Sequence, residues 1–97
     1  MWILTSDTTA GEAPLTLRLL PGAVKTLGRA PQADFIVEAT LVSRLHCRFV
    51  AGKAGLEVED LRSTNGTFVN DQRVTRATLG PGDVVRVGEL SLQVSRP

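Results

Sequence analysis

Arginine and hydroxyl side chains concentrate in three short segments of the chain. These are Gly28-Arg29, Ser43-Arg44-Leu45-His46 and Ser63-Thr64-Asn65-Gly66-Thr67. Arginine presents a planar fork of N–H donors that matches phosphate oxygens, and hydroxyl groups donate to the oxygens that remain. If loops bring the three segments to one end of the molecule, two guanidinium groups and several hydroxyls converge there. The pattern then predicts a site for a phosphate dianion.

Each segment also has a simpler interpretation. Gly28-Arg29 by itself is typical of a turn followed by a solvated charge, and Asn65-Gly66 is a strong hairpin-turn signal. His46 is the only histidine of the chain. It is either a pH-sensitive ligand or a ring that bonds nearby backbone and holds the Ser43 loop in shape. The second interpretation of His46 is favoured.

Motifs for catalysis and for metal binding are missing from the sequence. Gly52-Lys53 resembles the end of a phosphate-binding P-loop, but the glycine five positions earlier and the hydroxyl residue after the lysine are absent. Ser43, His46 and Asp60 do not make a recognisable hydrolase triad, because no nucleophile-elbow glycines flank the serine. One histidine and one cysteine do not build a usual metal site. We therefore expect a binding module and not an enzyme, with no metal and no cofactor.

Short strands are the elements expected to position these segments. Leu90-Ser91-Leu92-Gln93-Val94-Ser95 has apolar residues at every second position, the period of a strand with one buried face. Turn signals such as Pro21-Gly22 and Gly80-Pro81-Gly82 recur at short intervals. The predicted strands lie at about residues 2–5, 15–20, 24–28, 35–37, 46–51, 55–60, 67–69, 72–74, 83–87 and 90–95. Tight hairpins join antiparallel strands, whereas parallel pairs need long crossovers, so the expected fold is all-β and antiparallel.

The segment from Ser6 to Pro14 is small and polar, and we interpret it as the hairpin loop between the first two strands. Thr8-Thr9 in this loop is a candidate for phosphorylation, after which it would dock into the pocket of the same or a neighbouring molecule. A plain loop is the favoured interpretation.

The bulk properties indicate one globular domain over residues 1–97. Hydrophobic residues make up 42% and charged residues 22%, an ordinary globular balance. The net charge of +1, with no tyrosine and three phenylalanines, argues against a nucleic-acid or membrane partner. No secretory signal and no bilayer-length apolar run are evident, so a cytoplasmic location is expected. The single cysteine, Cys47, is interpreted as a core residue and not as a reactive thiol.

In this order and spacing the three segments resemble the forkhead-associated (FHA) domain, whose pattern is Gly-Arg, then Ser-x-x-His, then Ser-x-Asn-Gly-Thr. Asp60-Leu61 and the turn of Leu79, Gly82 and Asp83 also fit the family pattern. The resemblance runs from about residue 4 to residue 94. It implies a β-sandwich of about eleven strands, with the termini close together and phosphothreonine-binding loops at one end.

The resemblance also implies a role for each motif residue. Arg29 is similar to the main phosphate-binding arginine, and Ser43 and Thr64 are similar to hydroxyl residues that touch the phosphate. Many members of the family make a second phosphate or peptide contact from the position that Arg44 occupies here. Asn65 matches the asparagine that bonds the peptide main chain. The positions that support the site structurally are Gly28, His46 and Gly66.

Leu45 departs from the family, because many members carry a basic or polar residue there; this leaves side-chain preference open. The implied partners are threonine-phosphorylated proteins and components of Ser/Thr kinase signalling. The alternative function is a phospho-independent scaffold or assembly module of the same fold. Degenerate members of that kind lose the arginine or the serine, whereas Arg29 and Ser43 are both present here.

Overall fold

The computed structural model describes residues 1–6 and 15–97. Within these residues the chain forms eleven strands and no helix, so none of its elements is a helix long and apolar enough to cross a membrane. The strands are β1 (Trp2–Ser6), β2 (Thr16–Leu19), β3 (Val24–Gly28), β4 (Phe35–Ile36), β5 (Cys47–Gly52), β6 (Gly55–Asp60), β7 (Thr67–Val69), β8 (Gln72–Val74), β9 (Arg76–Leu79), β10 (Val84–Val87) and β11 (Leu90–Ser95).

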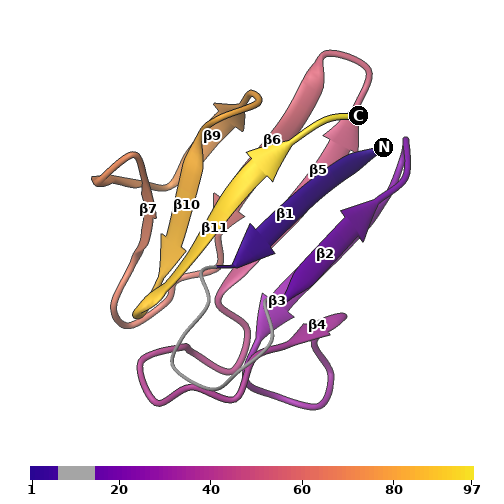
Figure 1. Ribbon diagram of the computed structural model, residues 1–97. Helices are drawn as coiled ribbons and strands as arrows, with labels where there is room; N and C mark the ends of the chain where they lie inside the picture. The colour runs from indigo at the N-terminus through magenta and orange to yellow at the C-terminus, as the bar shows by residue number, and fades with distance from the viewer. Residues whose placement is uncertain (7–14) are drawn as a thin grey trace.

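The strands build the two sheets of a β-sandwich (Figure 1). Six strands form one sheet in the order β2-β1-β11-β10-β7-β8, and five form the other in the order β4-β3-β5-β6-β9. The first and last strands are neighbours, with Ile3 opposite Ser95. Figure 1 accordingly shows the two chain ends side by side, far from the loops at the bottom of the view. The expected all-β sandwich is confirmed.

Alternation along the strands fills the space between the two sheets. In β11, Leu92 and Val94 point inward and are almost fully buried, while Gln93 is exposed. Fully burying a leucine or phenylalanine side chain contributes about 1.5–3 kcal/mol. Cys47 belongs to the same core, and its burial raises the pKa of its thiol, as expected for a packing residue and not for a nucleophile. The largest fully buried core side chains are Leu4, Leu19, Leu27, Phe49, Leu56 and Leu92.

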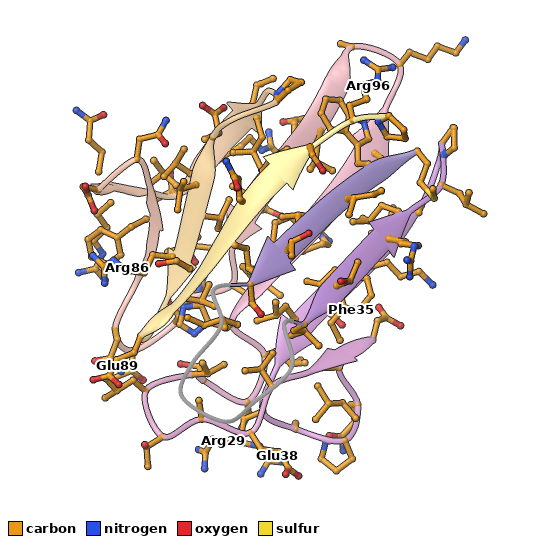
Figure 2. The ribbon with its side chains drawn as sticks, in the orientation of Figure 1. Arg29, Phe35, Glu38, Arg86, Glu89 and Arg96 are labelled. Atoms are coloured by element: carbon orange, nitrogen blue, oxygen red, sulfur yellow. The ribbon has the colours of Figure 1, made fainter. Side chains whose placement is uncertain are left out.

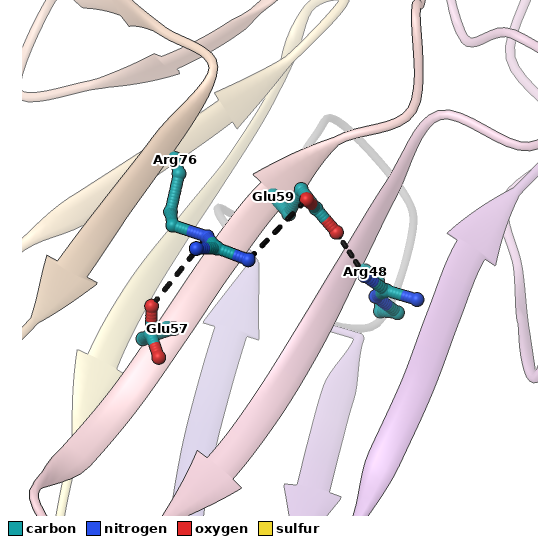
Figure 3. A network of polar contacts seen from close by, with 4 residues as sticks. All are labelled: Arg48, Glu57, Glu59 and Arg76. Carbon is teal, nitrogen blue, oxygen red and sulfur yellow. Dashed lines mark hydrogen bonds and ion pairs between the residues drawn. The ribbon is translucent and has the colours of Figure 1, made fainter.

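Strand β9 was missing from the sequence prediction. Only Leu79 of its four residues is buried, so the apolar alternation that marks a strand is weak there. Backbone pairing holds β9 against β6, and cross-strand charge pairs lie over this pairing (Figure 3). Arg76 Nε lies 3.7 Å from Glu57 Oε1, and its terminal nitrogen lies 3.5 Å from Glu59 Oε2. Glu59 also pairs with Arg48 on β5, which makes a ladder of alternating charge across three strands.

The expectation of purely antiparallel pairing was wrong at one place. Strands β3 and β4 pair in parallel, with Leu27 opposite Phe35. The reason is the length of β4. A strand of two residues spans only about 7 Å, so the return from the end of β3 needs no long crossover, and residues 29–34 suffice. The Asp34 carboxylate secures this return, since it accepts hydrogen bonds from the backbone and hydroxyl of Thr26 at 2.8 and 3.2 Å.

The predicted loop over residues 6–14, including Thr8-Thr9, lies outside the described residues except for Ser6 itself. On the two sides of this segment, β1 and β2 pair antiparallel. The Ser6 N–H donates to the Leu15 carbonyl at 2.8 Å, and the Leu15 N–H donates to the Ser6 hydroxyl at 2.6 Å.

Candidate functional site

The three arginine- and hydroxyl-rich segments meet at one end of the sandwich. Gly28 ends β3, while the other two segments lead into β5 and β7. They surround an open hollow of about 140 Å³. That is the volume of four or five waters at ~30 Å³ each, enough to admit a phosphate group. Figure 2 shows Arg29 at this end and Arg96 at the opposite end. The residues that line the hollow are Arg29, Thr40, Leu41, Val42, Ser43, Thr64 and Asn65.

Gly28 allows the first two segments to touch through their backbones. A Cβ atom at this position would lie 2.1 Å from the carbonyl oxygen of Arg44, which no side chain can do. The approach is fixed by two hydrogen bonds of 3.0 Å, from the Arg29 N–H to the Ser43 carbonyl and from the Ala30 N–H to the Arg44 carbonyl. The absence of a side chain at Gly28 thus places Arg29 beside the Ser43 loop.

Arg29 is held in place without being neutralised. Its Nε donates to the Val42 carbonyl at 3.1 Å, and the side chain is otherwise exposed at the hollow. Among the described residues its two terminal nitrogens have no carboxylate within ion-pairing distance. An arginine has five N–H donors, so four remain for an anion.

Ser43 and Asn65 join the second and third segments. The Ser43 hydroxyl oxygen accepts from the Thr64 N–H at 3.0 Å. Because the oxygen acts as acceptor in that bond, its own proton is available to a ligand. The Asn65 side-chain amide donates to the Leu41 carbonyl at 3.0 Å, and its side-chain oxygen accepts no hydrogen bond from the residues that the structure describes.

His46 lies beneath the hollow and does not line it. Its ring is fully buried and bonds backbone on both sides. The Ser43 N–H donates to Nδ1 at 3.0 Å, and Nε2 lies 2.8 Å from the Gly66 carbonyl. Nδ1 therefore accepts through its lone pair, and Nε2 carries the proton that it donates to the Gly66 carbonyl. A ring with one proton is neutral. This geometry matches the favoured interpretation, in which the histidine ties two loops together.

Asp60 organises the third segment, a role that sequence reasoning missed. Its carboxylate accepts from the Ser63 N–H at 3.1 Å, from the Ser63 hydroxyl, and from the Thr67 hydroxyl at 2.7 Å. Burial alone would raise the pKa of Asp60, but these hydrogen bonds outweigh it and lower the pKa. The available signal was the spacing of an aspartate three and seven residues ahead of hydroxyl side chains.

Gly66 completes the third segment with a backbone conformation that favours glycine. Its φ is +91°, and its N–H donates to the Ser63 hydroxyl at 2.9 Å. A Cβ atom here would also lie 2.7 Å from Nε of Arg73. The same turn directs the Gly66 carbonyl at His46.

Arg44 is not among the residues that line the hollow. Its side chain is exposed, and its carbonyl is the group that contacts Gly28 and Ala30. Conversely, Thr40, Leu41 and Val42 line the hollow and were not among the predicted site residues. Leu41 and Val42 contribute their carbonyl groups, and no pattern of side-chain types reveals such backbone contributions.

The fold is a two-sheet β-sandwich whose loops at one end enclose a hollow lined by Arg29 and Ser43. The FHA domain family model matches residues 25–88, which is well over half of the chain. The chain belongs to the FHA domain family.

Relatives in sequence include proteins much longer than this chain. The ABC transporter ATP-binding/permease protein Rv1747 of Mycobacterium tuberculosis is 47% identical over 78 residues, covering 80% of this chain and 9% of that protein. The glycogen accumulation regulator GarA of the same species is 38% identical over 74 residues, covering 76% of this chain and 46% of that protein. The chain thus spans less than half the length of either relative.

Solved structures match nearly the whole chain. The FHA domain of FhaA, complexed with the intracellular domain of Rv3910, is 34% identical with a TM-score of 0.85, covering 98% of this chain and all of that one. A structure from work on phosphothreonine-dependent FHA domain interactions is 32% identical with a TM-score of 0.79, covering 98% of both chains.

Proposed function

We propose that this domain binds threonine-phosphorylated segments of partner proteins at the hollow between its three loops. One observation carries the proposal. The terminal guanidinium nitrogens of Arg29 and the hydroxyl proton of Ser43 are both left without partners among the described residues, at one hollow of phosphate size. Thr64 supplies a further hydroxyl on the same wall. The role is recognition and not catalysis.

The chemistry of this hollow favours a phosphorylated threonine over one with a bare hydroxyl. Phosphorylation adds about 1.5–2 negative charges and three strong acceptor oxygens. Each charge-assisted hydrogen bond contributes roughly 1.5–3 kcal/mol, so two or three of them separate the two forms by several orders of magnitude. We expect micromolar dissociation constants, which correspond to a binding free energy of about −8 kcal/mol and suit reversible signalling.

Asn65 and Arg44 are assigned to the peptide around the phosphate. The free side-chain oxygen of Asn65 suits a main-chain N–H of the ligand. The exposed Arg44 side chain stands next to the hollow without lining it, so its contact is with flanking residues. The preference for phosphothreonine over phosphoserine rests on the family. A partner phosphorylated by a Ser/Thr kinase and a cytoplasmic location complete the proposal.

The decisive experiment is an oriented phosphopeptide library screen followed by fluorescence-polarisation titration. Matched peptides carry phosphothreonine, phosphoserine or bare threonine. Arg29→Ala removes the free guanidinium, and we expect at least a hundredfold loss of phosphothreonine binding with the fold retained. Arg96→Ala, at the opposite end of the sandwich (Figure 2), is the control and should bind as the parent does.

Two results would reject this function. One is an Arg29→Ala variant that binds phosphothreonine peptides as tightly as the parent. The other is equal binding of phosphorylated and bare peptides by the parent, which would favour the phospho-independent scaffold instead.

A further inference from the structure

A second hollow lies at the other end of β3. Arg29, in the phosphate hollow, follows the last residue of this strand, whereas the second hollow is lined by Lys25 near its start and by the turn before it. The β2–β3 turn that lines it lies at the upper right of Figure 1, away from the loops at the bottom. Its volume is about 620 Å³. We call it the β2–β3 groove, and its lining residues are Met1, Arg18, Leu20, Pro21, Gly22, Ala23 and Lys25.

The groove exposes apolar side chains that the core does not use. Leu20 is 65% exposed and Met1 41%. Scattered apolar residues on a surface need no explanation, but two large ones that line the same hollow mark a candidate interaction site.

Two cations flank this apolar surface. Arg18 comes from β2 and Lys25 from β3, so they stand on the two different sheets. Neither forms an ion pair among the described residues. The Asp34 carboxylate, which is hydrogen-bonded to Thr26, attracts Lys25 without forming an ion pair with it. Both cations therefore keep N–H donors for carboxylates of a ligand.

The outer edge of β2 offers backbone groups to the same ligand. β2 is the last strand of its sheet, and it pairs on its inner side with β1. The hydrogen bond from Ser6 to Leu15 sets the alternation of this ladder, so the N–H and C=O groups of Thr16 and Arg18 point outward. In the described part of the chain no strand pairs with that edge. An extended segment can add there as a further strand.

We propose that the β2–β3 groove binds an extended acidic segment of a partner protein. The segment pairs with the outer edge of β2, places apolar side chains against Leu20 and Met1, and places carboxylates near Arg18 and Lys25. Because this groove and the phosphate hollow lie at opposite ends of β3, one domain can hold a phosphothreonine and an acidic strand at the same time.

The test uses the whole chain labelled with ¹⁵N and a synthetic hexapeptide that alternates glutamate and valine, blocked at both ends. A peptide with glutamine in place of glutamate is the neutral control. At millimolar peptide we expect shifts of the Arg18, Ala23 and Lys25 amides. We also expect slower hydrogen exchange of the Thr16 and Arg18 amides. The neutral peptide should bind at least tenfold more weakly.

Charge reversal separates the groove from the phosphate hollow. Arg18→Glu combined with Lys25→Glu should weaken the acidic peptide at least tenfold and leave phosphothreonine-peptide affinity within about twofold of the parent. Lys53→Glu reverses an exposed cation in the β5–β6 turn, outside the groove, and should change neither affinity. Arg29→Ala should bind the acidic peptide as the parent does, so the two proposals stand or fall separately.

Three outcomes would overturn the acidic-strand proposal. The first is the absence of amide shifts at the groove with millimolar acidic peptide. The second is equal binding of the acidic and neutral peptides, or an unchanged affinity in the charge-reversed variant. The third is a shift of the groove amides with protein concentration alone, since the occupant would then be a second copy of this chain.

Discussion

Two regions of the molecule use arginine in different ways. On the outer face of β5, β6 and β9, Arg48 and Arg76 pair with Glu59 and Glu57, as Figure 3 shows. At the loop end, Arg29 is oriented by a carbonyl oxygen and meets no carboxylate among the described residues. A carbonyl fixes the direction of a guanidinium without cancelling its charge. The comparison teaches that the neighbours of an arginine, and not its exposure, decide whether it is available to an anion.

The loop end is also built differently from the charge ladder. Its cross-links run between backbone groups and polar side chains, chiefly those of His46 and Ser63, which are buried, and Asp60, which is partly buried. The ladder lies on regular strands whose backbone is already paired. Removing a buried cross-link leaves an unpaired polar group, whereas removing an exposed ion pair returns both charges to water. Substitutions at the loop end should therefore cost far more.

Gly28→Ala should give the largest loss of stability. Its new Cβ would collide with the Arg44 carbonyl at 2.1 Å, and backbone cannot move aside as a flexible side chain can. We expect unfolding to become easier by about 3 kcal/mol, together with loss of phosphopeptide binding. Urea denaturation measures the first effect. Gly52→Ala is the control, because its Cβ would meet nothing closer than 3.8 Å. Equal stability of the two variants would contradict the close backbone contact.

His46→Phe should come next. Phenylalanine fills a similar volume but leaves the Ser43 N–H and the Gly66 carbonyl without their shared partner. The expected cost is about 2 kcal/mol, because each buried polar group left unpaired carries a desolvation penalty. Phosphopeptide binding should weaken as well, since the ring joins the second and third segments. A variant with parental stability and weakened binding would instead make His46 a ligand-contacting residue.

Asp60→Asn should cost about 1 kcal/mol at neutral pH, since an amide cannot accept from all three donors of the loop. Burial raises the pKa of Asp60, but the hydrogen bonds from Ser63 and Thr67 outweigh it and hold the pKa below its ordinary range, so folding favours the charged form. That stability is present above about pH 4 and is lost as the pH falls through the lowered pKa. Urea titrations from pH 7 to pH 2 should show the difference between parent and variant shrinking toward acid. A difference that stays constant with pH would contradict the charge-dependent role.

The sequence predicted most of this architecture because two strong signals coincide with it. Strands such as β11 alternate apolar and polar residues, which predicts their buried face. The three motif segments contain the arginine and hydroxyl side chains themselves, so the sequence shows which residues belong to the site. What escaped prediction depends on other physics. β9 buries only one side chain, that of Leu79, so its apolar alternation is too weak to mark a strand, and the parallel pairing of β4 with β3 follows from a short return that no side-chain pattern marks. The carbonyls of Leu41 and Val42 shape the hollow through backbone geometry, which residue types do not encode.

Arg76→Ala should have the smallest effect and tests the other side of the comparison. Both ion pairs of Arg76 are at least 3.5 Å long and largely exposed, so their loss should change the free energy of unfolding by less than about 1 kcal/mol. Phosphopeptide affinity should stay at the parental value, because this arginine belongs to the ladder and not to the hollow. Urea denaturation and fluorescence polarisation on one preparation measure both. A loss of affinity comparable to that of Arg29→Ala would show that overall positive charge, and not the placement of Arg29 beside Ser43, captures the phosphate.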